Sequence, residues 1–251
     1  PRVFQGKGVT TWEDLIKSVR AKVKGTKVKI RLGASSGEWK AMVADEAART
    51  TFAKNIKTVL EKNKLDGIDL DFEWAENEKE YKDYSLAILK MREVLGDKYL
   101  FSVSLHPVCY KISKEAIEAV DFISLQCYGP SPVRFPIEKY CSDIQMVLEY
   151  GIPKEKLVAG VPFYGVTKDN SKKTEAYFNF VQNGLVTSPA QNEVIYQGDT
   201  YVFDGQDNIR IKTRYAKEQK LKGMMSWDLA TDLPLSDSRS LLKTMTEELR
   251  E

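Results

Sequence analysis

Hydrophobic residues along this chain fall into short runs that favour β-strands. Val28, Ile30 and Leu32 alternate with polar residues, and comparable runs recur further along the chain. The predicted strands comprise residues 28–32, 65–74, 99–106, 122–128, 157–163 and 223–227. None of these runs is followed by the Gly-rich phosphate turn that an open doubly wound sheet usually carries.

Between the predicted strands, apolar residues recur with the spacing of a helix. Tyr84, Ile88, Met91 and Leu95 form one such stripe, and Gly96 ends it. Further helices are predicted around residues 12–23, 52–60, 116–120, 140–148 and 241–249. Because strands and helices alternate, we expect a parallel sheet.

Polar residues at the ends of the predicted strands favour a TIM (β/α)8 barrel. Glu73, Tyr128 and Trp227 each occupy the carboxyl end of a strand, where such barrels carry their catalytic side chains. Ser124 and Gln126 share a strand face with Tyr128. We therefore expect polar side chains inside the barrel and apolar side chains against the helices.

The composition argues against several classes of protein. A chain of 251 residues with 42% hydrophobic and 29% charged residues is typical of one globular domain, and no apolar run approaches the ~20 residues that span a membrane. The net charge of +2, without a basic stripe, gives no support for a nucleic-acid partner.

Cys109, Cys127 and Cys141 lack metal-ligand spacing and are expected to be buried thiols. With His106 as the single histidine, we expect neither a metal site nor a cofactor.

Residues 65–74 carry the most informative pattern in the sequence. Asp69, Asp71 and Glu73 alternate with large apolar residues, so the carboxylates share one strand face. An ordinary half-exposed strand would show a similar alternation. However, Asp66-Gly67 is unusual chemistry inside a strand, and three like charges on one face favour the protonated form of one of them. The segment therefore predicts a concentrated acidic site.

Residues 66–73, which read Asp-Gly-Ile-Asp-Leu-Asp-Phe-Glu, resemble the signature of the family 18 glycoside hydrolases. This family includes chitinases and some endo-β-N-acetylglucosaminidases. Residues 150–165 resemble its seventh-strand segment, residues 222–227 its eighth, and Gly33-Ala34 its third-strand pair of small residues. The similarity runs from about residue 28 to the C-terminus.

The resemblance implies one (β/α)8-barrel catalytic domain over residues 1–251. Nothing before residue 28 represents the family's first two strands, so we expect an N-terminally incomplete domain from a longer chain. Residues 166–205 form a polar excursion between the seventh and eighth strands, with a predicted hairpin around Gln197-Gly198-Asp199. The excursion is too short for the family's large inserted α+β domain, which implies an open groove suited to endo-acting cleavage.

The position of the acids limits the mechanism. Simple retaining and inverting glycosidases place two carboxylates on opposite sides of the sugar, whereas Asp71 and Glu73 lie on one strand face. The resemblance implies substrate-assisted catalysis instead. In that mechanism Glu73 protonates the glycosidic oxygen, Asp71 orients the substrate's 2-acetamido group as its oxygen attacks, and Tyr128 hydrogen-bonds that oxygen. Asp69 is then expected to be a supporting charge.

Aromatic side chains are the expected substrate platforms, because the C–H faces of sugar rings stack on aromatic planes. Trp227 matches the family's eighth-strand tryptophan, beneath the reacting sugar. Trp74, Trp39 and Tyr164 lie just past strand ends, where substrate contact and core packing both stay open. Gln126 is expected to face the substrate from the sixth strand.

Two further positions affect the expected site. Arg31 shares a strand face with Gly33 and is expected to point toward the acids. The family usually has Asp after its sixth-strand tyrosine and Met two positions before it, whereas here Gly129 follows Tyr128 and Gln126 precedes it. The hydrogen bonding around the acetamido group is therefore left open.

Three classes of function fit the sequence. The first is a hydrolase of β-1,4-linked N-acetylglucosamine, with chitin or chitooligosaccharides as substrates, or as an endo-β-N-acetylglucosaminidase on N-glycan cores. The second is a non-catalytic chitinase-like protein that binds carbohydrate, and the third is a barrel enzyme that holds a divalent metal on the acidic strand. The resemblance further implies a monomer whose partner is an oligo- or polysaccharide containing N-acetylglucosamine, in a secreted, periplasmic or cell-surface location.

Overall fold

The computed structural model describes residues 11–35, 37–129, 135–169 and 173–250. The chain forms two compact units, which we describe separately. Residues 1–103 and 112–121 belong to the first unit, and residues 104–111 and 122–251 to the second. No helix in the described ranges is long and apolar enough to cross a membrane.

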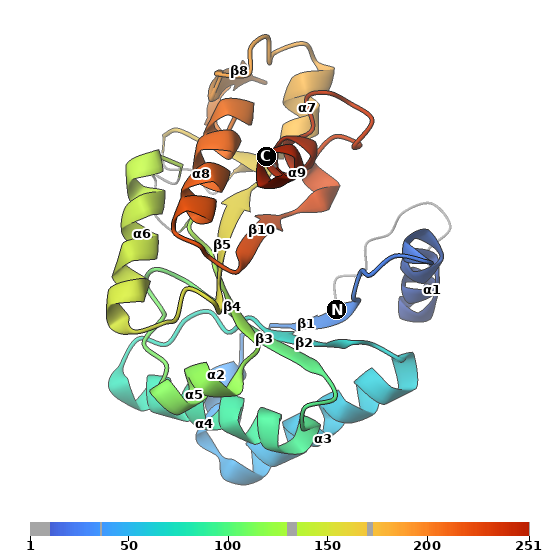
Figure 1. The fold of residues 1–251 in the computed structure, drawn as a ribbon, viewed down its shortest axis with the longest axis vertical. Coiled ribbons are helices and arrows are strands. Elements are labelled where there is room, and N and C mark those ends of the chain that lie inside the picture. The colour runs from blue at the N-terminus through green and yellow to red at the C-terminus, as the bar shows by residue number, and fades with distance from the viewer. Residues whose placement is uncertain (1–10, 36, 130–134, 170–172, 251) are drawn as a thin grey trace. The chain divides into compact units, whose positions relative to one another are not determined.

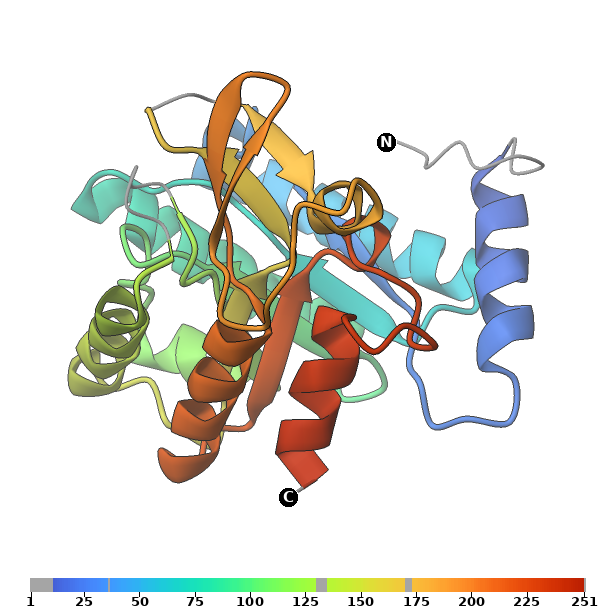
Figure 2. The ribbon, with the colours of Figure 1, turned by 90° about the horizontal axis from the view of Figure 1, so that it is seen from above.

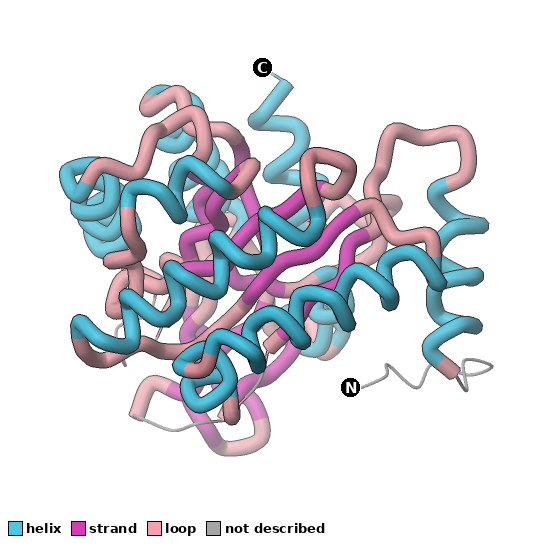
Figure 3. The backbone as a smooth tube through the Cα atoms, turned by 90° about the horizontal axis from the view of Figure 1, so that it is seen from below, coloured by secondary structure: helices cyan, strands magenta, loops and turns pink. Residues whose placement is uncertain are grey.

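The first unit is a parallel sheet with helices packed on it. Its elements are α1 (Trp12–Val23), β1 (Arg31–Ala34), α2 (Trp39–Ala44), α3 (Glu46–Asn63), β2 (Gly67–Leu70), α4 (Glu78–Leu95), β3 (Leu100–Leu105, of which the last two residues belong to the second unit) and α5 (Lys114–Ala119). The strands follow the order β1-β2-β3 and are parallel, with Asp69 paired to Gly33 on one side and to Ser102 on the other. Helices α3, α4 and α5 lie on one side of these strands (Figure 1), and α3 runs beside α4 (Figure 3). This arrangement confirms the predicted parallel sheet.

The apolar half of the acidic segment forms the centre of this unit. Ile68, Leu70 and Phe72 are at most 2% exposed, and Tyr84 of α4 packs on Phe72 with ring centroids 5.3 Å apart. Helix α4 ends where predicted, because Gly96 caps it and donates its N–H to the Arg92 carbonyl. Burial of these large side chains fixes which face of β2 the acids occupy.

The second unit also contains parallel strands covered by helices. Its elements are β4 (Phe122–Leu125), α6 (Ile137–Tyr150), β5 (Leu157–Pro162), β6 (Tyr164–Thr167), β7 (Thr174–Ala176), α7 (Tyr177–Gln182), β8 (Glu193–Tyr196), β9 (Asp199–Val202), α8 (Gln206–Glu218), β10 (Gly223–Trp227), η1 (Leu229–Thr231) and α9 (Leu241–Arg250). Strands β4, β5 and β10 are parallel neighbours in that order. Helix α8 packs against both α6 and α9 (Figure 2).

The excursion between β5 and α8 folds into an antiparallel sheet of order β7-β6-β9-β8. Strands β8 and β9 form a hairpin that closes at the Tyr196–Asp199 pair. Gln197 and Gly198 lie between them with φ of 52° and 86°, the backbone that a tight two-residue hairpin turn requires. The orange and yellow strands at the top of Figure 2 show this sheet.

Two of the predicted strands extend three or more residues beyond the carboxyl ends of the strands in the structure. The acidic strand was expected over residues 65–74 but ends at Leu70, because its neighbour β1 ends at Ala34. The strand expected over residues 122–128 ends at Leu125, where the Cys127 N–H donates to the Leu125 carbonyl in a tight turn. The predicted alternation of faces therefore does not reach Glu73 or Tyr128, whose side chains are positioned by the loops that follow the strands.

Gly67 provides a test of how closely β2 approaches β3. A Cβ atom at this position would lie 1.9 Å from the Leu100 carbonyl oxygen. This oxygen belongs to the backbone of β3, so relieving the clash would require the strand to shift. We expect Gly67→Ala to lower the free energy of unfolding by ~3 kcal/mol, as overpacking against a fixed neighbour does. The matched control is Gly33→Ala on β1, where a Cβ meets nothing within 4 Å. Urea unfolding that gives equal stability for both variants would refute this account of the close approach.

Candidate active site

Asp66 fixes the start of the acidic strand between its two neighbours. Its carboxylate accepts a hydrogen bond from the Ile30 N–H at 2.7 Å, and its own N–H donates to the Ile30 carbonyl at 2.8 Å. On the other side, its carbonyl accepts from the Leu100 N–H at 3.0 Å. The first acid of the motif is thus bound to backbone groups, and it sets the register of the acids that follow.

Asp69 forms a charged cluster with two residues from the neighbouring strands. Ser102 Oγ donates to Asp69 Oδ1, and Arg31 Nη1 donates to the same Ser102 oxygen. The Arg31 nitrogen lies 3.9 Å from Asp69 Oδ1, and the two side chains are 25% and 17% exposed. Burial lowers the pKa of Arg31, and the nearby Asp69 charge opposes that shift. The expectation that Arg31 points toward the acids is confirmed.

Ser102 was not singled out from the sequence. Its signal is the alternation along β3, where Ser102 and Ser104 interrupt the apolar run of Phe101, Val103 and Leu105. This polar face pairs with the acidic strand, because Ser102 is in register with Asp69.

Glu73 presents an exposed side chain from a firmly held backbone. The Trp39 indole N–H donates to the Glu73 carbonyl at 3.1 Å, and the Trp39 ring stacks on Phe72 at 5.3 Å with planes 10° apart. Asp71, on the other side of Phe72, is half-buried, and its N–H donates to the Ala34 carbonyl at 2.9 Å. The two acids therefore flank a buried aromatic ring that fixes the chain between them.

Of the two roles left open for Trp39, the structure supports core packing rather than substrate contact. Its side chain is 1% exposed, so no face of the indole is open to a sugar ring. The reason is local: Trp39 begins helix α2, and packing on Phe72 and Tyr84 places it beneath the acidic segment. Trp74 follows Glu73 through a cis peptide bond and is half-buried.

Trp227 is the most exposed of the expected platforms in the described residues. It ends β10, pairs with Pro162 of β5, and is 55% exposed. Its carbonyl accepts from the Phe163 N–H at 2.8 Å, so the backbone is fixed while the indole stays open. Asp228, next along the chain, caps the helix η1 through the Ala230 N–H at 2.8 Å.

Tyr128 and Tyr164 belong to one aromatic cluster of the second unit. Their rings meet edge to face with centroids 6.3 Å apart, and Phe135 meets Tyr164 in the same way at 6.3 Å. Tyr128 is 6% exposed, and its hydroxyl lies 3.9 Å from the Met225 sulfur. Gly160 makes room for this ring, since a Cβ there would lie 3.1 Å from Tyr128 Cε1.

A buried ion pair supports this cluster from helix α8. Lys212 Nζ lies 2.6 Å from Asp204 Oδ2 and donates to the Phe135 carbonyl at 2.8 Å, and both charged side chains are at most 1% exposed. Burial raises the pKa of Asp204, which the Lys212 charge opposes. No sequence pattern pointed to this pair, because a lysine in a polar helix normally predicts an exposed face.

Gln126 and two of the three cysteines of the second unit are buried. Gln126 is 9% exposed, and its N–H donates to the Leu105 carbonyl at 2.8 Å. Cys109 and Cys127 are buried thiols as expected, and burial raises the pKa of Cys127 to about 12. Cys141 is only partly buried, which corrects the expectation for that residue. No group of three or more His, Cys, Asp or Glu side chains suited to a metal occurs among the residues with assigned positions.

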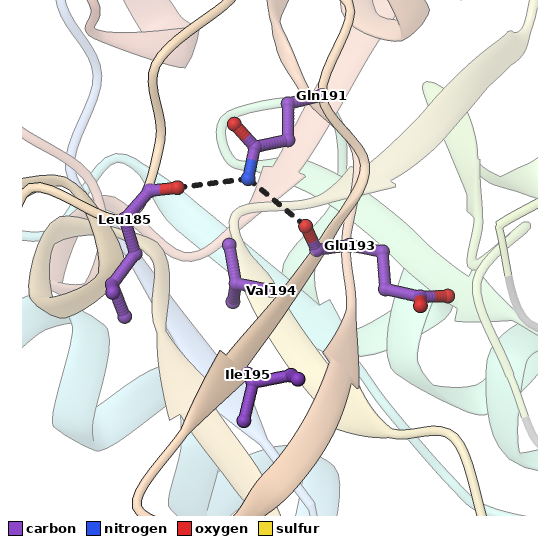
Figure 4. Close-up of a pocket in the computed structure, with 5 residues that line it drawn as sticks. All are labelled: Leu185, Gln191, Glu193, Val194 and Ile195. Atoms are coloured by element: carbon purple, nitrogen blue, oxygen red, sulfur yellow. Dashed lines mark hydrogen bonds between the residues drawn. The ribbon is translucent and has the colours of Figure 1, made fainter.

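A cavity of about 390 Å³ lies on the excursion and holds none of the expected catalytic residues. Figure 4 shows its lining of Leu185, Gln191, Glu193, Val194 and Ile195. The Gln191 amide spans the cavity wall, donating to the carbonyls of Leu185 at 2.8 Å and Glu193 at 3.0 Å. These bonds make Gln191 part of the hairpin's support.

Known proteins of similar sequence and fold are chitinases or chitinase-like. The sequence profile of glycosyl hydrolases family 18 matches residues 5–232. The probable chitinase 2 of Drosophila melanogaster is 23% identical over 273 aligned residues, which cover 82% of this chain and 56% of that protein. The chain spans about half the length of the curated relatives it matches.

Solved structures share the fold. A chitinase from Bacteroides thetaiotaomicron superposes with a TM-score of 0.81 at 22% identity, covering 93% of this chain and 80% of the other. A chitinase-like agglutinin from Robinia pseudoacacia superposes with a TM-score of 0.77 at 19% identity, covering 94% and 84%. The predicted TIM-barrel class is confirmed by these likenesses.

The buried pair gives a stability prediction for the second unit. We expect Lys212→Met to cost ~3–5 kcal/mol, because it leaves Asp204 buried without its counter-charge. The loss should be larger at neutral pH than near about pH 4. The folded-state pKa of Asp204 would be raised further in the variant. Well below its unfolded pKa the carboxyl group is protonated in both states and costs nothing, whereas at higher pH the folded state is increasingly destabilised because ionisation favours the unfolded state.

Urea unfolding of the wild type and of Lys212→Met at both pH values measures this loss in the free energy of unfolding. Lys212→Met/Asp204→Leu should recover most of the loss, since it removes both charges. Lys168→Met, which breaks the exposed pair with Glu193, is the control and should stay close to wild type. A loss that is the same at both pH values would contradict the assignment to Asp204.

Proposed function

Because the chain belongs to glycosyl hydrolases family 18, we propose that it hydrolyses β-1,4-linked N-acetylglucosamine in chitin or chitooligosaccharides by substrate-assisted retaining catalysis. One observation carries the assignment. Glu73 exposes its carboxyl group from a backbone that the Trp39 indole and the Phe72 ring hold in place. A general acid needs this combination of access and fixed position.

In the proposed reaction, Glu73 gives its proton to the glycosidic oxygen as the bond from that oxygen to the anomeric carbon breaks. The oxygen of the substrate's own 2-acetamido group forms a bond to the anomeric carbon, and a cyclic oxazolinium ion results. A water molecule then attacks the anomeric carbon as the bond from that carbon to the acetamido oxygen breaks, and Glu73, now a carboxylate, takes a proton from this water. The two displacements together retain the anomeric configuration.

The other acids of the segment have distinct proposed roles. Asp71, half-buried beside Phe72, accepts a hydrogen bond from the acetamido N–H and stabilises the positive charge of the oxazolinium ion. Asp69 is engaged with Ser102 and Arg31, which suits a supporting charge rather than a group that contacts substrate. Because Arg31 offsets the Asp69 charge, the segment carries less net negative charge than its sequence implies.

The resemblance to the family supplies the other proposed contacts to the sugar. Tyr128 donates its hydroxyl hydrogen to the acetamido oxygen, and the Tyr164 and Phe135 rings limit its motion. The open indole of Trp227 is the stacking platform for the sugar. Trp74, Tyr164 and Gln126 stay candidates for further substrate contacts.

Chitin is favoured over N-glycans because the relatives of this chain are named chitinases. An endo-β-N-acetylglucosaminidase activity on N-glycan cores is the alternative substrate choice within the same chemistry. We also propose that the protein acts outside the cytoplasm, where such a polymer is encountered, and as a monomer.

A carbohydrate-binding protein without activity is the second candidate function. The structural likeness to the Robinia agglutinin supports it, as does Gly129 at the position where the family usually has Asp. Retention of Glu73, Asp71 and Tyr128 favours the hydrolase.

A metal-dependent enzyme is the third reading, and removal of metal tests it. The proposed mechanism uses only carboxyl, hydroxyl and acetamido groups, so we expect activity to survive dialysis against EDTA unchanged. Restoration of a lost activity by Mg²⁺ or Ca²⁺ would instead favour a divalent ion on the acidic segment.

The decisive experiment compares the full-length protein with its Glu73→Gln variant. We expect wild type to release the chromophore from an aryl chitobioside, and Glu73→Gln to lose at least ~100-fold in kcat, because general acid catalysis contributes about that much. The variant should still bind chitotetraose, since the amide keeps the shape of the site. Glu61→Gln, an exposed carboxyl on helix α3, is the matched control.

An N-glycopeptide assayed in parallel decides the substrate class. Faster Glu73-dependent cleavage of the glycopeptide would replace chitin with N-glycan cores. Inactivity of the wild type with retained chitotetraose binding would overturn the hydrolase in favour of the binding protein.

A further inference from the structure

His106 is a buried titratable residue that the proposed mechanism does not use. It is the single histidine of the chain and is 3% exposed. It directly follows Leu105, the last residue of β3, a strand that carries the polar residues Ser102 and Ser104. A polar ring at this depth needs a structural or functional reason.

Local hydrogen bonds hold the His106 ring in one orientation. Two backbone bonds with Cys109 close a tight turn, at 3.2 Å from the His106 N–H and 2.7 Å from the Cys109 N–H. The Val108 N–H donates to Nδ1 at 3.3 Å. In the neutral imidazole, a nitrogen that accepts a hydrogen bond carries no proton, so the proton resides on Nε2.

The Nε2 atom lies beside Gly129, the residue after Tyr128. A Cβ atom built on Gly129 would come within 3.3 Å of Nε2, closer than side chains ordinarily tolerate. Gly129 and His106 are thus complementary: the glycine leaves a space beside the imidazole, which reaches it from the turn after β3.

We propose that His106, in the turn after β3, is a positioning residue for Tyr128, and that its imidazole takes the place of the side chain that Gly129 lacks. The ring packs against the backbone at Gly129 and fixes the preceding residue, so that the Tyr128 hydroxyl meets the acetamido oxygen of the bound sugar. This inference rests on the proposed function, because its effect is measured on substrates containing N-acetylglucosamine. It accounts for the departure at Gly129 through a compensating residue elsewhere in the chain.

A double-mutant cycle in the full-length protein tests the pair. We expect His106→Ala and Gly129→Asp each to lower kcat on an aryl chitobioside by about tenfold or more, because small displacements of a catalytic group have effects of this size. In His106→Ala/Gly129→Asp, the carboxyl group fills the vacated volume, and kcat should return to within a few-fold of wild type. If the fold-loss in kcat of the double variant equals the product of the fold-losses of the two single variants, the proposal is overturned.

Two conservative variants separate positioning from mere packing. In His106→Gln, the side chain is long enough to place its amide nitrogen where Nε2 lies, and this variant should keep most of the activity. In His106→Asn, the shorter side chain keeps only an acceptor for the Val108 N–H, so kcat should fall with little change in KM. Equal activity of wild type, Gln and Ala at position 106 would overturn the proposal. If Gly129→Asp does not fold, as thermal unfolding by circular dichroism shows, Gly129→Ala takes its place in the cycle. Gly223→Ala, with nothing within 4 Å of its Cβ, is the control.

The outcome can be distinguished from a failure of the proposed function. Glu73→Gln is assayed alongside, and a wild type without Glu73-dependent cleavage would refute the hydrolase but not the pairing of His106 with Gly129. The same cycle is then measured as the Kd for chitotetraose by calorimetry. If the two substitutions are coupled in their effects on the free energy of chitotetraose binding, the positioning role is supported. If their effects on that free energy simply add, the positioning role is overturned.

Discussion

The hydrogen bonds of Asp66 and the close approach of Gly67 to Leu100 are the constraint on which the acidic segment depends. Asp66 binds the backbone of both adjoining strands, and Gly67 allows β2 to come so close to Leu100 that no side chain fits between them. The two residues together fix the register of β2. A shift of one residue would exchange Asp69 with a buried leucine or isoleucine and move every carboxylate to the apolar face.

Beyond the end of β2, aromatic packing replaces the sheet as the positioning force. Phe72 lies in a group of rings with Trp39 and Tyr84, and the indole N–H of Trp39 binds the backbone of Glu73. The acid that the reaction needs therefore lies on a loop with the rigidity of a core. This accounts for a carboxyl group that is exposed and yet fixed, two requirements that a freely moving loop would not meet together.

The second unit positions its tyrosine by a related principle. Lys212, buried with Asp204, binds the carbonyl of Phe135, and Phe135 packs on the Tyr164 ring that meets Tyr128. In each unit, a buried side-chain N–H donates to a backbone carbonyl within a group of aromatic rings: Trp39 to Glu73 in the first unit and Lys212 to Phe135 in the second.

The sequence by itself determined the parallel strand-helix alternation, the end of a helix at Gly96, the acidic segment and the family. These features follow from periodicity and from short motifs, which are local properties. It also predicted that Arg31 points toward the acids, since strand faces alternate. Only the tertiary structure showed that strands end before Glu73 and Tyr128, that Trp39 is buried support, and that Lys212 pairs with Asp204. The physical reason is that burial and pairing between residues far apart in the chain depend on which surfaces meet when the chain folds, and no local pattern records that.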